Sequence, residues 1–286
     1  MKIGVIGGSG IYDLEGVEKE GWKRVDTPFG EPSSEYLLAR LGDKEIVFLP
    51  RHGKKHTIPP SFINYRANIY GFKLLGVERI ISVSACGSLQ EEIKPLSFVI
   101  PDQFVDRTNQ ARKYTFFDEG IVVHIGFSHP VCPYLSEVLY EAAKEAGVEV
   151  KKGGTYLNME GPQFSTLAES NLYRQWGMDI IGMTNLAEAR LAREAEICYA
   201  TLAAVTDYDC WRQKTEEVTA EMVIENLLKN VANAKKILSL AIPKIKAERD
   251  CLCAKALENS VVTRAESIPF PTKEKLKPII GRLIKE

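Results

Sequence analysis

Residues 2–16 read KIGVIGGSGIYDLEG, and this stretch indicates the fold class. A short apolar run from Ile3 to Ile6 leads directly into a glycine- and serine-rich loop, Gly7 to Gly10. Buried parallel strands are typically short apolar runs, and open α/β sheets bind ligands outside the carboxyl ends of such strands. The stretch therefore predicts a first strand over 2–7 and a loop able to approach a phosphate group. A purely structural tight turn explains the loop equally well.

Length and composition indicate an ordinary globular enzyme. The chain has 286 residues, of which 45% are hydrophobic and 26% charged. Its formal net charge of -1 provides no global field that would attract nucleic acid or an anionic membrane. No apolar stretch approaches the roughly 20 residues of a membrane-spanning helix, and the N-terminus lacks the basic segment of a signal peptide. We expect a cytoplasmic protein without nucleic-acid or membrane partners.

Apolar runs and helical patterns alternate along the chain, which predicts an α/β fold with a largely parallel sheet between helices. Strands are predicted over 2–7, 44–50, 78–84, 97–104, 121–126, 178–183 and 196–206. Helices are predicted near 61–75, 133–147, 166–176, 185–194 and 219–247. We interpret residues 1–286 as a single domain. Its polar, lysine-rich extension over 248–286 is expected either to pack near a subunit interface or to be a loosely attached, solvated terminus.

The glycine loop does not complete any common nucleotide or nucleophile motif. A dinucleotide-binding G-x-G-x-x-G lacks its third glycine, and a G-x-S-x-G elbow around Ser9 lacks its last. A Walker loop would require Gly-Lys-Ser/Thr, which is also absent. What remains is the Ser9 hydroxyl and exposed backbone N–H groups at the end of a strand.

Two further stretches place polar groups at predicted strand ends. FLPRHGKKHTIPP (48–60) contains Arg51 and His52, and VSACGSL (83–89) contains Ser84 in a loop of small residues. Arginine suits phosphate, and small residues let backbone amides approach an anion. Together with the first loop they predict a shared anion pocket, the alternative being a solvated basic turn. The i, i+4 spacing of His52 and His56 does not predict zinc, because Gly53 and two prolines argue against a helix.

AAVTDYDCW (203–211) ends a hydrophobic strand with a pair of acids, Asp207 and Asp209. At i and i+2 they point to the same side if the chain is extended, and one of two adjacent carboxyls has a raised pKa. A protonated carboxyl can donate to N7 of adenine while an ionised one accepts from N6. A 6-oxopurine would suit an asparagine better, so the pair favours adenine. The alternative is a turn with ordinary acids.

Long blocks of the sequence resemble the trimeric purine nucleoside phosphorylase family, and in particular its methylthioadenosine phosphorylase branch. The matching blocks run in order from about residue 3 to 245: GGSGIYD, RHGKKHTIPPSFINYRANI, SACGSLQEEIKP, DQFVDRT, MEGPQFSTLAES, IGMTNLAEARLAREAEICYA and TDYDCW. The resemblance implies a single α/β domain with a mixed central sheet flanked by helices, in a homotrimer or a hexamer of two trimers.

The resemblance also implies a pentosyltransferase of purine and methionine salvage. Inorganic phosphate, a co-substrate, would cleave S-methyl-5'-thioadenosine to adenine and 5-methylthioribose 1-phosphate, without a cofactor or metal. The implied phosphate ligands are Ser9, Arg51, His52, Ser84, Ala85 and Thr184. Phe164 would line the base pocket and Met183 the ribose, Asp207 would protonate N7 as the catalytic acid, and Asp209 would engage N6. Ser165 and Ala220 would influence substrate choice, and the small Ala220 implies a broader specificity that includes adenosine.

Six cysteines are expected to be free thiols in a cytosolic protein, although Cys251 and Cys253 form a C-x-C pair that could bridge or bind a soft metal. Scarce glutamine and abundant charged residues favour a thermophile. Related enzymes of hyperthermophiles carry disulfides, including a C-x-C near the C-terminus. The resemblance therefore implies the pairs Cys132–Cys198 and Cys251–Cys253, with Cys86 and Cys210 free.

Three alternative functions remain open from the sequence. A phosphorylase for 6-oxopurine nucleosides or methylthioinosine would be signalled by asparagine at position 207, where this chain has aspartate. A nucleosidase that uses water would not need the anion pocket predicted around Arg51. A non-catalytic nucleotide-binding protein is disfavoured by the incomplete glycine fingerprint.

Overall fold

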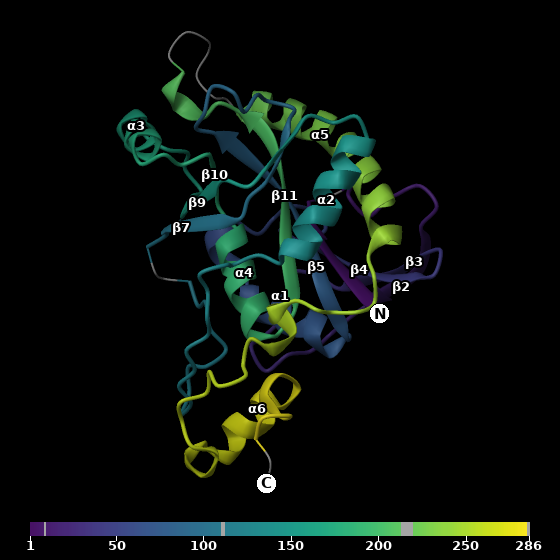
Figure 1. Cartoon of the computed structure of the whole chain (residues 1–286), viewed down its shortest axis with the longest axis vertical. Helices are drawn as coiled ribbons and strands as arrows, with labels where there is room; N and C mark the ends of the chain where they lie inside the picture. Colours follow the sequence, from purple (N-terminus) through teal and green to yellow (C-terminus); the bar gives the residue numbers. More distant parts are fainter. Residues whose placement is uncertain (9, 110–111, 213–219, 285–286) are drawn as a thin grey trace.

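The structure is a computed structural model that describes all residues except 9, 110–111, 213–219 and 285–286. Residues 220–223 and 227 are described by their backbone alone. Its centre is a mixed sheet flanked by helices on both faces, which confirms the predicted fold class (Figure 1). The strands are β1 (Lys2–Gly7), β2 (Glu18–Lys23), β3 (Tyr36–Leu41), β4 (Lys44–Pro50), β5 (Val77–Ser88), β6 (Phe98–Ile100), β7 (Gln103–Arg107), β8 (Val150–Lys152), β9 (Thr155–Met159), β10 (Ile180–Gly182) and β11 (Cys198–Asp207).

The long strand β5 joins two parts of the sheet and thereby creates the site. Along its first half β5 pairs in parallel with β1, through Ser82, and at Gly87 and Ser88 it pairs antiparallel with β10. Gly87 also faces Asp207 of β11, so β10 and β1 must share the edge of β5 that β11 leaves free. Between the two partners, residues 83–86 have no strand on that edge within the described part of the chain. This gap in the ladder is the place where a ligand can approach the sheet.

The sheet order is β2-β3-β4-β1-β5-β10-β9-β7, and β11, β6 and β8 extend from the other edge of β5. The strands β1, β4, β5 and β11 are mutually parallel, as predicted. The sheet as a whole is less parallel than the sequence pattern indicated. Short antiparallel connections add β2 and β3 to its edge, and β10 runs against β5.

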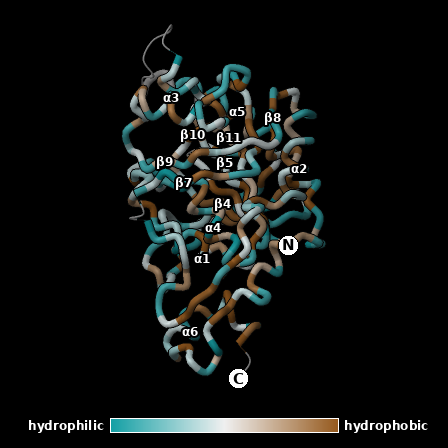
Figure 2. Tube along the Cα trace, turned by 60° about the vertical axis from the view of Figure 1, so that its left-hand side comes forward, coloured by the Kyte–Doolittle hydropathy of each residue, from teal (hydrophilic) through white to brown (hydrophobic). Residues whose placement is uncertain are grey.

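Helices cover both faces because alternate residues of the inner strands point to opposite sides. On β11, Cys198, Ala200 and Leu202 belong to the core under α2 and α5, whereas Tyr199 belongs to the core under α1 and α4. Figure 2 shows the hydrophobic residues gathered in the central strands β4 and β5. The helices are α1 (Tyr65–Leu74), α2 (Pro133–Glu145), α3 (Leu167–Gln175), α4 (Asn185–Glu194), α5 (Ala220–Lys244) and α6 (Phe270–Ile280). No helix in the described ranges is long and apolar enough to span a membrane.

Two of the predicted strands are wrong in detail. The run 97–104 divides into β6 and β7 at Pro101, which has no N–H to give to a ladder. The run 121–126 forms no strand. It makes only an isolated bridge between Val123 and Val261, because its backbone hydrogen bonds are made with the C-terminal extension. The sequence analysis also missed β2, β3, β8 and β9.

The C-terminal extension is attached to its own chain. Helix α6 packs against α1 and buries Leu276, Ile279 and Ile280, while the Tyr70 hydroxyl donates to the Lys275 carbonyl at 2.7 Å. A loosely attached, solvated terminus is therefore the wrong alternative. That this segment lies near a subunit interface stays a prediction.

Neither predicted disulfide is present, and all six cysteines are free thiols. The four sulfurs of Cys132, Cys198, Cys251 and Cys253 instead gather in one cluster. The sulfurs of Cys198 and Cys251, which the prediction did not pair, lie 3.3 Å apart. Spacing along the chain does not determine pairing, and here it also did not reveal that the two expected pairs meet at one point.

Candidate active site

Four strand ends meet around the gap in the ladder. Gly8 follows β1, Arg51 and His52 follow β4, Ser84 lies in β5, and Asp207 ends β11. The Arg51 N–H donates to the Gly7 carbonyl at 3.0 Å, which joins the first two ends. Two adjoining cavities open here and share the residues Arg51, His52, His56, Ser84 and Ala85. The sequence-based prediction that these segments form one pocket is consistent with this geometry.

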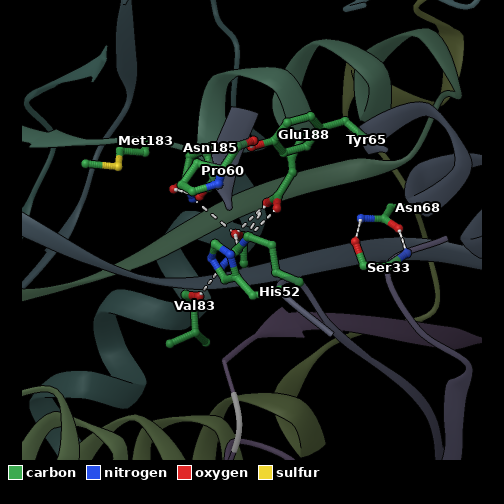
Figure 3. A network of polar contacts seen from close by, with 12 residues as sticks. Ser33, His52, Pro60, Tyr65, Asn68, Val83, Met183, Asn185 and Glu188 are labelled. Carbon is green, nitrogen blue, oxygen red and sulfur yellow. Dashed lines mark hydrogen bonds and ion pairs between the residues drawn. The ribbon is translucent and has the colours of Figure 1, made fainter. Parts of the chain in front are cut away.

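Arg51 is fixed by a carboxylate that the sequence analysis did not select. Its guanidinium donates to both Glu188 oxygens, at 2.5 and 3.2 Å, and both side chains are almost completely buried. Further bonds run to the Val83 carbonyl at 2.9 Å and the Ser82 hydroxyl at 2.6 Å. Figure 3 shows Glu188 and Asn185 of α4 pointing toward the end of β4, where His52 lies. Four of the five N–H donors of Arg51 are thus used within the described residues, and the guanidinium edge lines both cavities.

Arg51 is held in its charged form. Burial alone lowers the pKa of Arg51, but the charge and hydrogen bonds of Glu188 outweigh burial and raise it above the usual value. Asn185 completes the network, because its amide donates to Ser82, Tyr199 and Thr201 at 3.0–3.1 Å. The group therefore presents a permanent, rigidly oriented cation to the cavity.

His52 is set up as a neutral ring in the free protein. Its Nδ1 lies 2.8 Å from the Ile58 carbonyl, so Nδ1 carries the proton and Nε2 is left as an acceptor. Burial, followed by the charge of Arg51, lowers the pKa of His52 to about 4. A phosphate bound beside it would raise that pKa or share its own proton with Nε2. The ring also stacks on His56, with centroids 4.4 Å apart.

Ser84 provides a free hydroxyl at the centre of the gap. Its side chain is 7% exposed, and its Oγ has no hydrogen-bond partner among the described residues; the nearby Tyr156 hydroxyl has none either. A buried hydroxyl without a partner costs free energy unless a ligand or water satisfies it. Since Ser84 lines both cavities, a ligand in the site would supply that partner.

Thr184 stands immediately before α4, where the helix dipole favours an anion. Its side chain is buried and lines the larger cavity, and it does not cap the helix. The Asn158 side chain accepts from the Leu186 N–H at 3.1 Å in its place. The Thr184 hydroxyl contacts Asn185 Oδ1 at 3.3 Å. Arg51, His52, Ser84 and Thr184 therefore form one wall that is suited to an anion.

The larger cavity is also lined by the acidic pair. Asp207 Oδ1 accepts from the Asp209 N–H at 2.8 Å, and its Oδ2 accepts from the Thr206 hydroxyl at 2.7 Å. The chain turns sharply here, with Asp209 at a φ of 47°, so the two carboxyls meet through a local turn rather than through strand alternation. Gly87 permits the close approach, because a Cβ there would lie 2.9 Å from Asp207 Oδ1.

Burial favours the protonated form of both acids. Each is 8% exposed, and burial raises the pKa of both carboxyls above the usual value. Hydrogen bonds from Thr206 and Asp209 oppose the shift at Asp207. At Asp209 the Ser170 hydroxyl, which donates at 2.5 Å, opposes the shift, whereas the charge of Asp207 adds to it. The pair can thus offer one donor and one acceptor side by side.

Apolar side chains enclose the space between the two walls, a cavity of about 300 Å³ that is suited to a small ligand. Phe164 is half exposed at its rim, and Met183 lies inside beside Thr184. Met159, Ile181 and Ile224 also line it and were not predicted. Met183 lines the same cavity as the acidic pair and the anion-binding residues, which is consistent with a sugar contact.

Three predicted site residues are not found lining the cavity, two of them because their side chains are not described. Ser9 lies outside the described residues, and of Ala220 only the backbone at the start of α5 is described. Ser165 does not line the cavity; its hydroxyl contacts the Met159 sulfur at 3.8 Å. An effect of Ser165 on substrate choice would act through Met159 or through the Asp209 carboxyl, both of which line the cavity and interact with the Ser165 side chain.

The sequence analysis missed several residues that position the site. Glu188 orients Arg51, Ser170 orients Asp209, and Asn230 of α5 lines the smaller cavity. A signal for Glu188 existed, because it follows Thr184 by four residues in a predicted helix and so lies on the same face. The other two come from helices whose contact with the site depends on tertiary packing, which spacing does not indicate.

Comparisons with known proteins agree with this geometry. The model of the phosphorylase superfamily matches residues 2–243. The S-methyl-5'-thioadenosine phosphorylase of Koribacter versatilis is 56% identical over 285 residues, which cover 100% of this chain and 97% of the relative. A crystal structure of a methylthioadenosine phosphorylase from an antarctic soil metagenomic library has a TM-score of 0.92 and 46% identity, covering 97% of this chain and 98% of its own.

A more distant structure carries a ligand. A mutant of the adenosine/methylthioadenosine phosphorylase of Schistosoma mansoni, in complex with methylthioadenosine, has a TM-score of 0.84 and 37% identity, covering 91% of this chain and 96% of its own. The matches extend over nearly the whole chain, and the strand ends that form the site lie within them. On this sequence and structural evidence, the chain belongs to the phosphorylase superfamily.

Proposed function

We propose that the protein is a pentosyltransferase that cleaves S-methyl-5'-thioadenosine with inorganic phosphate, giving adenine and 5-methylthioribose 1-phosphate. The observation that carries this proposal is that one cavity is lined both by groups suited to an anion and by a buried acidic pair. Arg51, Ser84 and Thr184 form the anion side, and the buried pair Asp207 and Asp209 forms the base side. The phosphorylase relatives named above support the same reaction.

The two walls match the charges that develop in this reaction. The bond between the sugar C1' and the base N9 breaks with its electron pair on the base, and a phosphate oxygen forms the new bond to C1'. Positive charge develops on the sugar beside the phosphate dianion, and negative charge develops on the purine. The Asp207 carboxyl delivers its proton to N7 and neutralises the base as it departs, a contribution of about 10²–10⁴-fold. Holding both reactants in line contributes further.

The acidic pair favours adenine over a 6-oxopurine. A protonated Asp207 donates to N7, and Asp209, which the Ser170 hydroxyl fixes at 2.5 Å, accepts from the N6 amino group. A 6-oxopurine would place its O6 acceptor against a carboxylate and leave both unpaired. The related 6-oxopurine function is therefore disfavoured by the site itself.

Some finer properties are part of the proposal. Turnover of adenosine is expected because the small side chain of Ala220 would leave a wider pocket for the 5'-substituent. A homotrimer or hexamer is expected from the family resemblance. Function without a cofactor is also expected, with phosphate as co-substrate. Cytoplasmic location likewise stays a prediction.

The test is to incubate the protein with methylthioadenosine, adenosine or inosine, each with and without phosphate, and to measure base release. We expect phosphate-dependent adenine release from methylthioadenosine, slower release from adenosine and little hypoxanthine from inosine. Equal release without phosphate would indicate a nucleosidase, and preference for inosine would indicate a 6-oxopurine enzyme. Either result would refute the proposal.

A further inference from the structure

The cluster of four cysteines lies far from the active site. Cys198 is the first residue of β11 and Asp207 is the last, so nine residues of strand, or about 30 Å, separate the cluster from the acidic pair. Cys132 immediately precedes α2, and Cys251 and Cys253 come from the short turn after α5. Three segments that are distant in sequence thus bring their sulfurs to one point, and the proposed reaction does not use them.

The arrangement of the sulfurs resembles a tetrahedral metal site. All four Sγ atoms lie within 4.8 Å of one another, and three of the four residues are buried. Zinc bound by four thiolates has Zn–S distances of about 2.3 Å, which places the sulfurs about 3.8 Å apart at the corners of a tetrahedron. The cluster therefore needs only small side-chain adjustments to close around an ion, and its four ligands would complete the shell of a structural site.

Two arginines beside the cluster have no acidic partner. Arg79 is completely buried on β5 and donates to Cys198 Sγ at 3.6 Å and to the Lys246 and Glu248 carbonyls at 2.8 and 2.5 Å. Arg249 donates to the Glu196 carbonyl, and its Nε is buried without a hydrogen-bond partner in the described structure. Neither guanidinium forms an ion pair with a carboxylate among the residues described. Arg249 is only partly buried, whereas Arg79 is completely buried, and a buried charge is normally paired, so Arg79 in particular requires a nearby anion.

A metal tetrathiolate supplies an anion of matching charge. One divalent ion and four thiolates carry a net charge of −2, which two guanidinium groups balance. Two disulfides would be neutral and would leave both arginines uncompensated. The surroundings thus favour a negatively charged cluster over two neutral disulfides.

We propose that Cys132, Cys198, Cys251 and Cys253 bind one divalent thiophilic cation of the zinc class, as a structural site. On binding, the four thiols become metal-bound thiolates and release four protons, with no change in oxidation state. Only sulfur ligands are present, and this donor set selects zinc over magnesium or calcium. The ion fastens the turn over residues 251–253, and with it the start of the C-terminal extension, to α2 and β11.

The test measures metal binding directly. The full-length protein is purified under reducing conditions, and its zinc content is determined by mass spectrometry. Reduced, metal-free protein is then titrated with Co²⁺, whose tetrahedral tetrathiolate complex absorbs strongly in the visible range. We expect about one ion per chain, and zinc should displace the Co²⁺ signal. Bound zinc should also protect four of the six cysteines from alkylation.

Two matched variants assign the ligands. Cys253→Ser should lose the zinc and the Co²⁺ absorption, whereas Cys210→Ser, which changes a cysteine outside the cluster, should retain both. The wild-type titration decides the question even if Cys253→Ser fails to fold. Absence of bound metal from reduced, folded wild-type protein would overturn the proposal. So would an unreduced chain, unfolded in the presence of a metal chelator, in which only Cys86 and Cys210 react as free thiols, since the cluster would then be oxidised rather than metal-bound.

Discussion

Ser84 and Asp207 illustrate how single residues set the chemistry of the site. The buried Ser84 hydroxyl has no hydrogen-bond partner among the described residues, and burial raises the pKa of the Asp207 carboxyl. Both positions follow strand-like apolar runs, and for this reason the sequence could identify them. The hydrogen-bond partners of the two acids could not be predicted, because Thr206 contacts Asp207 through a local turn and Ser170 contacts Asp209 through tertiary packing.

Replacing Ser84 tests the anion wall. Ser84→Ala removes a hydroxyl that would bond a charged phosphate, an interaction of about 1.5–3 kcal/mol, so we expect the KM for phosphate to rise about 10- to 100-fold. The KM for methylthioadenosine should change much less. Steady-state kinetics at varied phosphate provides the measurement, with the exposed Ser128→Ala as the control. An unchanged phosphate KM would show that Ser84 does not contact the anion.

At the scale of elements, helix α4 connects the site to the core. It presents Thr184 at its start, Glu188 one turn later and Glu194 at its end, and its bounds were predicted correctly from the pattern TNLAEARLARE. The predicted helix placed Glu188 on one face but could not show that this face meets the end of β4. That contact depends on the order of strands in the sheet, which local periodicity does not encode.

Removing the partner of Arg51 should destabilise the protein. Glu188→Ala leaves a buried guanidinium without its carboxylate, which typically costs about 3–5 kcal/mol in the free energy of unfolding. Phosphate binding should weaken as well, because Arg51 loses its fixed orientation. Urea unfolding measures the first effect. Glu225→Ala, which breaks an exposed i, i+4 pair with Lys229 on α5, is the matched control and should have no measurable effect. Equal stability of the two variants would contradict the role of Glu188.

At the scale of the whole molecule, the sheet branches at β5, and the resulting gap brings the anion-binding residues and the acidic pair to one cavity. The sequence pattern indicated the parallel strands β1, β4, β5 and β11 and also a strand around β10, but it did not show that the three residues of β10 run antiparallel to β5. Short strands and the edge hairpin leave weak periodic signals. The packing of α6 was missed for a similar reason, since its apolar residues are spread through a lysine-rich segment.

The pH dependence of stability is a further whole-molecule property. Burial raises the pKa of Glu194 to about 7 from an unfolded value of 4.5, even though the Phe116 N–H donates to it at 2.7 Å. The folded state therefore binds a proton at Glu194 more tightly than the unfolded state does. The contribution of this proton to the free energy of unfolding is fully present below pH 4.5 and is lost as the pH rises through 7. Each pKa unit corresponds to about 1.4 kcal/mol, so the loss approaches about 3 kcal/mol.

Glu194→Gln should flatten this dependence. We expect the difference in the free energy of unfolding between pH 5 and pH 8 to be smaller for the variant than for the wild type. It should not vanish, because Asp207 and Asp209 shift in the same direction. Chemical unfolding across this pH range measures it, and parallel curves for the two proteins would show that Glu194 is not buried as a neutral acid.

The central claim, that Asp207 gives a proton to the departing adenine, is tested most directly with two leaving groups. Wild type and Asp207→Asn are compared on methylthioadenosine and on a 5-methylthioribose with a nitrophenolate leaving group, which departs without a proton. We predict a loss of about 10²–10⁴-fold in kcat on methylthioadenosine and near-normal turnover of the nitrophenyl substrate. Undiminished turnover of methylthioadenosine, or equal losses on both substrates, would contradict the assignment.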